Sequence, residues 1–279
     1  MANGAGVAIA GVVIGIVLAS QADEFTPAEL PELPDTTQTA ADGTGDSGGT
    51  ESSSGESSGD ASSGGSGSAA DPGPPHGLTT PGVINTLNTN ERVVALTFSS
   101  GPDPEYTPDV LDVLEQHGVV ATFCLTGEEV RENPIVVQNI VADGHTLCNQ
   151  GETLAYELAH RDRDAIDAEI SGGLDAIKEA VPDAEVPFFR APGGCFSAEV
   201  NEIAAQYDLE PLGWSVDPRD WERTDPDAVV RAVMDQVEPG SIVVLHDGDG
   251  DRSVTVAALD PLIEELRGDG YTFVVPDGS

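Results

Sequence analysis

Seven short apolar segments, rich in β-branched and aromatic residues, recur through the last two thirds of the chain. Most are near-continuous hydrophobic runs rather than polar–apolar alternations, which is typical of strands buried on both faces of a sheet. We predict strands at residues 92–98, 119–125, 145–149, 187–190, 211–216, 241–246 and 271–275.

Between these strands the apolar residues recur with the period of amphipathic helices. We predict helices at residues 106–117, 128–142, 161–181, 197–207, 225–237 and 255–268. Candidate N-cap residues support the start of three of these helices. They are Arg163 or Asp164 for the third helix, Ser197 for the fourth and Asp225 for the fifth.

Strands that alternate with helices predict an α/β fold with a parallel sheet. Seven strands in about 185 residues favour a small, distorted (β/α)7–8 barrel over an open doubly wound sheet. A glycine-rich dinucleotide fingerprint follows none of the predicted strands, which argues against a Rossmann domain.

The start of the chain has a different texture. Residues 4–20 form an uncharged apolar run that ends in the small-x-small pattern Ser20-Gln21-Ala22. We interpret residues 1–22 as a signal peptide or an N-terminal membrane anchor, although the basic residues that normally precede such a run are missing. The expected location is therefore outside the cytoplasm, either secreted or anchored at the outer face of the cytoplasmic membrane.

Residues 23–88 consist mainly of Ser, Gly, Thr, Pro and acidic residues. Such a segment cannot bury enough apolar surface to offset the entropy lost on ordering, so we predict a disordered linker. A flexible coil of this length spans about 45 Å. The alternative is a low-complexity tail without a role. The globular domain then comprises residues 89–279.

The formal net charge is −39, and all 11 lysine and arginine residues lie after residue 91. A surface of this sign repels phosphate backbones, so we expect no nucleic-acid partner. The acidity favours solubility and is uninformative about the fold.

Polar clusters follow five of the predicted strands. They read SSGP (99–102), NQGET (149–153), RAPGG (190–194), DPRDW (217–221) and HDGDGD (246–251). In a (β/α) barrel the carboxyl ends of the strands share one face, where active sites are built. The sequence therefore predicts a cleft at this face.

These motifs, extended to TFSSGP, GHTLCNQGETL, FRAPGG, DPRDW and LHDG, resemble in order and spacing those of the polysaccharide deacetylase family. This is the NodB-homology, carbohydrate esterase family 4 type. The resemblance covers residues 92–275 and implies the family's distorted barrel. It also implies metal-dependent hydrolysis of the carbon–nitrogen (not peptide) bond of an N-acetylated glycan, usually with zinc.

Four positions depart from the family pattern. The resemblance places Ser99 where the general base belongs, and Ser100, Gln150 and Leu154 where the three metal ligands belong. Divalent zinc prefers imidazole, carboxylate or thiolate ligands, and leucine has no donor atom. We therefore predict that the metal and the base are lost and that no cofactor binds.

Other catalytic positions are retained. The resemblance implies that His246 is the general acid, Asp220 the carboxylate that tunes it, and Arg190 the residue that orients the base. The substrate pocket that it implies contains Trp221, Leu245, Pro192, Gly194 and Asp217. The alternative is that Arg190 and Asp220 now serve only to hold the loops in place.

The sequence favours a catalytically impaired domain that binds cell-wall or chitin-like glycan. One alternative is an active hydrolase with a rearranged site. It would use Asp103, His145 or Glu152 as new metal ligands, or one of the two serines with His246 and Asp220 as a triad. Another alternative is a tethered structural module that binds a protein partner.

Two of the three cysteines lie on neighbouring predicted strands. Cys124 and Cys148 are therefore candidates for a disulfide in an exported protein, and the alternative is a pair of small buried core residues. Cys195 remains as the odd thiol.

Overall fold

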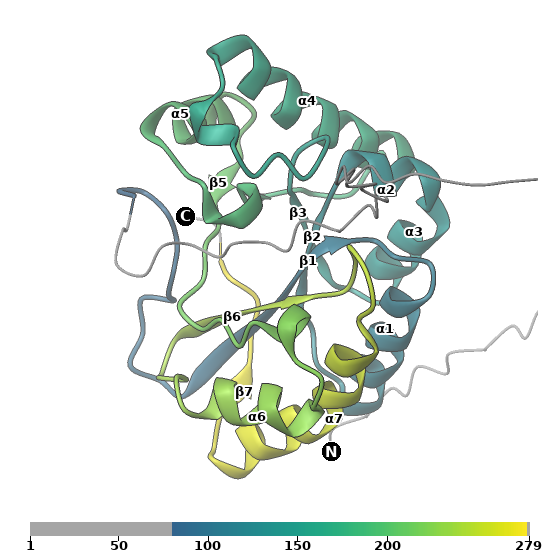
Figure 1. Ribbon diagram of the computed structural model, residues 1–279, viewed down its shortest axis with the longest axis vertical. Coiled ribbons are helices and arrows are strands. Elements are labelled where there is room, and N and C mark those ends of the chain that lie inside the picture. Colours follow the sequence, from purple (N-terminus) through teal and green to yellow (C-terminus); the bar gives the residue numbers. More distant parts are fainter. Residues whose placement is uncertain (1–79, 278–279) are drawn as a thin grey trace, which may run out of the picture. The chain divides into compact units, whose positions relative to one another are not determined.

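The computed structural model of the protein describes residues 80–277 (Figure 1). The predicted signal or anchor segment and most of the predicted linker lie outside the described residues. Within residues 80–277, no helix is long and apolar enough to cross a membrane.

A parallel sheet forms the centre of the domain (Figure 1). Its strand order is β5-β4-β3-β2-β1-β6, and β7 pairs with the first part of β1. The strands are β1 (Val93–Gly101), β2 (Thr122–Leu125), β3 (Thr146–Asn149), β4 (Phe188–Phe189), β5 (Glu210–Pro211), β6 (Ser241–His246) and β7 (Thr272–Phe273).

The sheet is closed by the segment that continues β5. Val216 bridges Val243 of β6: its N–H donates to the carbonyl of Ile242 (3.1 Å), and its carbonyl accepts from Val244 (3.0 Å). β5 itself has only two residues, so the ring closes through isolated bridges rather than a full ladder. This is the predicted distorted barrel, with predicted strand 211–216 replaced by a short strand and an irregular extension.

Seven α-helices connect the described strands (Figure 1). They are α1 (Tyr106–His117), α2 (Gly127–Glu132), α3 (Pro134–Ala142), α4 (Arg163–Ala180), α5 (Ala198–Gln206), α6 (Pro226–Met234) and α7 (Ser253–Gly268).

Two helix predictions need correction. The single helix expected at 128–142 is split at Asn133 (φ −128°, ψ 48°), because Pro134 disfavours the helical conformation in the residue before it. The cap of α4 is Asp162, which accepts a hydrogen bond from the N–H of Ala165 (3.0 Å), rather than Arg163 or Asp164. Ser197 and Asp225 cap α5 and α6 as predicted.

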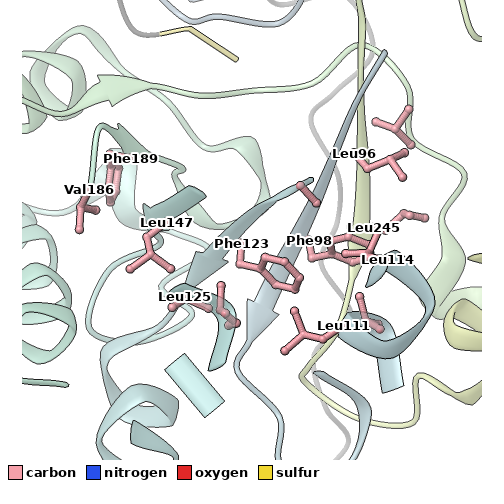
Figure 2. Close-up of a cluster of buried hydrophobic side chains, with 14 of the residues drawn as sticks. Leu96, Phe98, Leu111, Leu114, Phe123, Leu125, Leu147, Val186, Phe189 and Leu245 are labelled. Carbon is pink, nitrogen blue, oxygen red and sulfur yellow. The ribbon is translucent and has the colours of Figure 1, made fainter. Parts of the chain in front are cut away.

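The two faces of the sheet carry separate apolar clusters. The outer face packs against the helices through side chains such as Phe98, Phe123 and Leu147 (Figure 2). The inner cluster fills the barrel and consists of Ala95, Cys124, Cys148, Phe188, Leu212, Trp214, Ile242 and Val244. Because strand residues two apart share a face, the inner face continues upward to Ser99, Gln150, Arg190 and His246.

The predicted disulfide is present inside the barrel. Cys124 and Cys148 are direct partners in the β2–β3 register, both are fully buried, and a disulfide joins them across a Cα–Cα distance of 4.2 Å. Cys148 precedes Gln150 by two residues, so the covalent link lies one layer below the polar residues of the inner face. Cys195 is half-buried in the loop after β4.

Candidate functional site

The carboxyl end of β1 places two serines at the top of the inner face. Ser99 is opposite His246 in the β1–β6 register, and its Oγ accepts a hydrogen bond from Nη1 of Arg190 (3.0 Å). Ser100 is in the left-handed region (φ 67°), and its N–H donates to Oε1 of Gln150 (2.7 Å). Ser99 therefore contacts Arg190, and Ser100 contacts Gln150.

The guanidinium of Arg190 is fixed from several sides. Its side chain is 1% exposed, Nε donates to the carbonyl of Leu212 and Nη2 to that of Gly213, both at 3.2 Å. The guanidinium carbon lies 5.4 Å from the ring centroid of Trp214. The orientation that directs Nη1 toward Ser99 is thus set by β4 and the segment after β5.

His246 and Asp220 form a buried pair. Nδ1 of His246 lies 2.9 Å from Oδ1 of Asp220, while Oδ2 accepts from the backbone N–H of His246 (2.9 Å) and the hydroxyl of Thr255 (2.7 Å). Burial alone would raise the pKa of Asp220, but the charge of His246 and these hydrogen bonds hold that pKa below its usual value. An ionised carboxylate can only accept hydrogen bonds, so Nδ1 of His246 carries a proton and donates a hydrogen bond to Asp220.

An aromatic side chain adjoins this pair. The ring centroids of Trp221 and His246 are 4.6 Å apart in an edge-on arrangement. The indole N–H of Trp221 is buried and makes no hydrogen bond within the described part of the chain. The guanidinium carbon of Arg219 lies 5.4 Å from the indole ring centroid, and the backbone N–H of Arg219 donates to Asp217 (2.8 Å). Trp221 thus lies beside His246, whereas the side chain of Asp217 is hydrogen-bonded to Arg219.

Leu245 is not part of the site. Because side chains alternate along β6, Leu245 faces away from His246 and packs in the outer core with Phe98 and Leu114 (Figure 2). Val244 instead shares the inner face with His246. The prediction of Leu245 as a pocket wall is therefore wrong. The alternation of side chains along the strand, which can be followed in the sequence, already places Leu245 and His246 on opposite faces.

The glycine-rich loop after β4 lines a neighbouring cavity. Gly194, Gly213 and Trp214 border a space of about 30 Å³, enough for a water molecule or two. Pro192 is buried in the same loop. Gly194 therefore lies beside Trp214, and the described contacts do not join it to Trp221 or His246.

The residues that the sequence resemblance aligns with metal ligands do not fit a divalent metal. The Oε1 atom of Gln150 accepts the hydrogen bond of Ser100, and Leu154 is half-buried and has no donor atom. Across residues 80–277, three or more His, Cys, Asp or Glu side chains converge nowhere in a way that could hold a metal ion.

The proposed replacement ligands are dispersed. Asp103 accepts from the first turn of α1 (Tyr106 N–H, 2.9 Å), Glu152 pairs with Arg131, and Nδ1 of His145 accepts from the N–H of Ala121 (3.2 Å). Each of these side chains has a separate structural partner, so the structure brings together no relocated metal site from them.

The two serines also do not form a triad. The hydroxyl of Ser99 is bonded to Arg190, and within residues 80–277 no hydrogen bond joins either serine hydroxyl to His246. A nucleophilic serine needs its base within hydrogen-bond reach. The geometry therefore argues against a serine hydrolase.

Sequence reasoning overlooked Asp247. Its carboxyl group is fully buried, Oδ2 accepts from the hydroxyl of Thr107 (2.7 Å), and Oδ1 has no partner within the described residues. Burial raises its pKa to about 7. A Cβ at Gly101 would lie 2.5 Å from this carboxylate, so the glycine of SSGP is required by a close approach. That glycine was the signal that could have revealed the contact.

The polysaccharide deacetylase family model matches residues 86–212. The chain is 41% identical over 193 residues to a chitooligosaccharide deacetylase of Sinorhizobium fredii, covering 66% of this chain and 89% of that protein. It is 38% identical over 187 residues to a peptidoglycan-N-acetylglucosamine deacetylase of Bacillus cereus, covering 66% and 86%.

A solved structure of a pseudoenzyme has the same fold. This family 4 carbohydrate esterase pseudoenzyme from Bacillus anthracis superposes with a TM-score of 0.65 and 31% identity over 71% of this chain and 68% of that chain. A mutant of that pseudoenzyme with restored enzymatic activity matches equally well, with a TM-score of 0.65 and 32% identity over 71% and 70%. From its motifs, its barrel and these relatives, the chain belongs to the polysaccharide deacetylase family, the NodB-homology group of carbohydrate esterase family 4.

Proposed function

We propose that this chain is a catalytically inactive polysaccharide deacetylase homologue that binds N-acetylglucosamine-containing glycan of the cell wall. The observation that carries this proposal is the chemistry of four positions. Ser99, Ser100, Gln150 and Leu154 replace the base and the metal ligands, and the polar ones are hydrogen-bonded to each other or to Arg190.

The loss of the base has a direct chemical consequence. Serine at position 99 has no group that takes a proton near neutral pH, and its Oγ already accepts from a guanidinium. General-base catalysis contributes about 10² to 10⁴-fold, and the activation of water by a metal is lost in addition. Negligible turnover follows from these two losses together.

The retained side chains support ligand binding. Arg190 and the Asp220–His246 pair keep buried, well-defined positions, and Trp221 adds an aromatic surface beside them. Polar groups that converge beside an aromatic ring are typical of small-molecule sites. The names of two relatives, a chitooligosaccharide deacetylase and a peptidoglycan-N-acetylglucosamine deacetylase, give the glycan class that we propose here.

Location outside the cytoplasm is part of the proposal. The apolar run at residues 4–20 favours export or anchoring at the outer face of the membrane. The Cys124–Cys148 disulfide supports it independently, because disulfides persist in oxidising compartments and are rare in the cytosol.

One experiment separates this function from its alternatives. The full chain is titrated with chitopentaose by isothermal calorimetry, with and without added zinc. The mass of the recovered sugar is then measured by mass spectrometry. We expect saturable binding and a sugar that keeps all its acetyl groups. Loss of acetyl groups would show an active deacetylase, a function that the intact Asp220–His246 pair favours. Absence of saturable binding would leave a structural or protein-binding module.

A further inference from the structure

A short segment before β1 forms part of the barrel wall. Residues 83–87, which we call the strap, lie in a part of the sequence that was predicted as linker. Ile84 forms a parallel bridge with Leu212, and Thr86 forms an antiparallel bridge with Ser241. The strap therefore joins the segment that continues β5 to the first residue of β6.

The strap pairs backbone groups that would otherwise lie at an open strand edge. The N–H of Ile84 donates to the carbonyl of Pro211 (2.8 Å), and the carbonyl of Ile84 accepts from the N–H of Gly213 (2.9 Å). On the β6 side, the N–H of Leu87 donates to the carbonyl of Gly240 (2.8 Å). Because unpaired backbone groups are costly in a folded protein, these three bonds hold the strap to both neighbours.

Side-chain packing fixes the strap at the same places. Ile84 and Leu87 are half-buried and pack against the inner apolar cluster of the barrel. A Cβ atom at Gly213 would overlap Oδ1 of Asn85, and a Cβ atom at Gly240 would lie 2.6 Å from the carbonyl oxygen of Leu87. The close approach of the strap therefore requires glycine at both positions.

The segment that the strap holds is also the segment that holds Arg190. Nε of Arg190 donates to the carbonyl of Leu212 and Nη2 to that of Gly213, while Nη1 donates to Oγ of Ser99. The strap is bonded to the other edge of the same segment through Ile84. An unbroken series of hydrogen bonds therefore leads from the strap through Gly213 and Arg190 to Ser99.

We propose that the strap is a positioning element of the site, which directs the carbonyl of Gly213 and, through it, the guanidinium of Arg190. Leu212 is held independently by β4, because its N–H donates to the carbonyl of Phe189 (2.8 Å), whereas the N–H of Gly213 donates to the strap. When the strap is displaced, the carbonyl of Gly213 loses its fixed direction and the bond from Nη2 of Arg190 weakens. The inference concerns the geometry of the site and is independent of whether glycan binds there.

Trp214 provides a reporter beside this contact. Its ring centroid lies 5.4 Å from the guanidinium carbon of Arg190. Its indole N–H is buried and makes no hydrogen bond within the described part of the chain. Val83 and Asn85 of the strap line the small cavity that Trp214 borders. The indole signal of Trp214 therefore responds to the strap and to Arg190 together.

The test is a ¹H–¹⁵N correlation spectrum of the full chain, with the Nε–H of Arg190 assigned through Arg190→Lys. The chain has two tryptophans, and Trp221→Phe assigns their indole signals. Ile84→Pro removes the backbone donor of the strap and keeps an apolar side chain. We expect the amide of Gly213 and the Nε–H of Arg190 to exchange about five- to tenfold faster, and the Trp214 signal to shift.

Asn88→Pro is the matched control. Asn88 is exposed, and its N–H makes no hydrogen bond within residues 80–277, so the Arg190 and Trp214 signals should match those of the wild type. Ile84→Val keeps the donor and most of the packing and should also match. Ile84→Ala keeps the donor and loses packing, so it gives a smaller change in the same direction and replaces the proline variant if that variant does not fold.

Two results would overturn the inference. The first is faster exchange of the Gly213 amide in the Ile84 variants with unchanged signals of Arg190 and Trp214, because the strap would then be displaced without any effect on the site. The second is an equal change of the site signals in Asn88→Pro, because the effect would then be unrelated to the bonds of the strap.

Discussion

At the scale of single residues, the alternation of side chains along the strands decides which residues face the inside of the barrel. Arg190 and Asp220 lie in recognisable sequence motifs, and in the structure they contact Ser99 and His246. Leu245 was misplaced by one residue along β6, which moved it to the opposite face of the sheet. The hydrogen bond between Ser100 and Gln150 was beyond prediction, since it depends on a left-handed residue at the end of β1.

Asp247 makes stability depend on pH in an unusual direction. Its pKa is raised by burial to about 7 in the folded protein, against 3.8 for the free side chain, so the folded state binds the extra proton between these values. Stability from this group is therefore present at low pH and is lost as the pH rises through 7. The loss amounts to at most about 4 kcal/mol.

We expect Asp247→Asn to remove this dependence, because the amide can keep the bond from Thr107 without a charge. Denaturant unfolding at about pH 5 and pH 8 should show a variant that gains stability relative to the wild type at the higher pH. The control Asp208→Asn removes the same charge from an exposed position. If the two substitutions behave alike at both pH values, the buried carboxyl is ionised and the account of Asp247 is wrong.

At the scale of elements, long periodic segments were predicted well and short ones were not. The helix at Tyr106–His117 matches its predicted range, because its apolar period and its flanking residues agree. The two-residue strands β4, β5 and β7 carry almost no period of their own. They are defined by pairing with neighbours that are distant in the sequence, and a local pattern cannot show this.

The disulfide between β2 and β3 should be a major source of stability. It closes a loop with a sequence separation of 24 residues, for which the loss of unfolded-state entropy predicts about 3 kcal/mol. Cys124→Ala with Cys148→Ala should lower the free energy of unfolding by this amount or more, since it also leaves space in the barrel.

Wild-type protein refolded under reducing conditions keeps both sulfur atoms and provides the control for packing. It should lose about 3 kcal/mol as well in urea unfolding. A reduced protein as stable as the oxidised one would show that the disulfide does not stabilise the domain.

At the scale of the whole molecule, the strong negative charge opposes compaction. With 50 acidic and 11 basic side chains, repulsion between surface carboxylates favours the unfolded chain. Raising NaCl to about 0.5 M should screen this repulsion and raise the melting temperature by about 2–5 °C near pH 7.5.

The same salt change near pH 4.5 should have a smaller effect, because many carboxylates are then protonated. Scanning calorimetry at both pH values tests this directly. A salt effect of equal size at the two pH values would point to general salting-out instead of charge screening.

The central claim is that a deacetylase framework persists here without its base and metal ligands. It is tested most directly by acetate release from chitopentaose in the presence of zinc, for the wild type and for the variant Ser99→Asp, Ser100→Asp, Gln150→His and Leu154→His. In this variant the carboxylate introduced at position 99 would face Arg190, as the framework requires. We expect no acetate above the blank from the wild type and zinc-dependent release from the variant. Zinc-dependent release by the wild type would contradict the account.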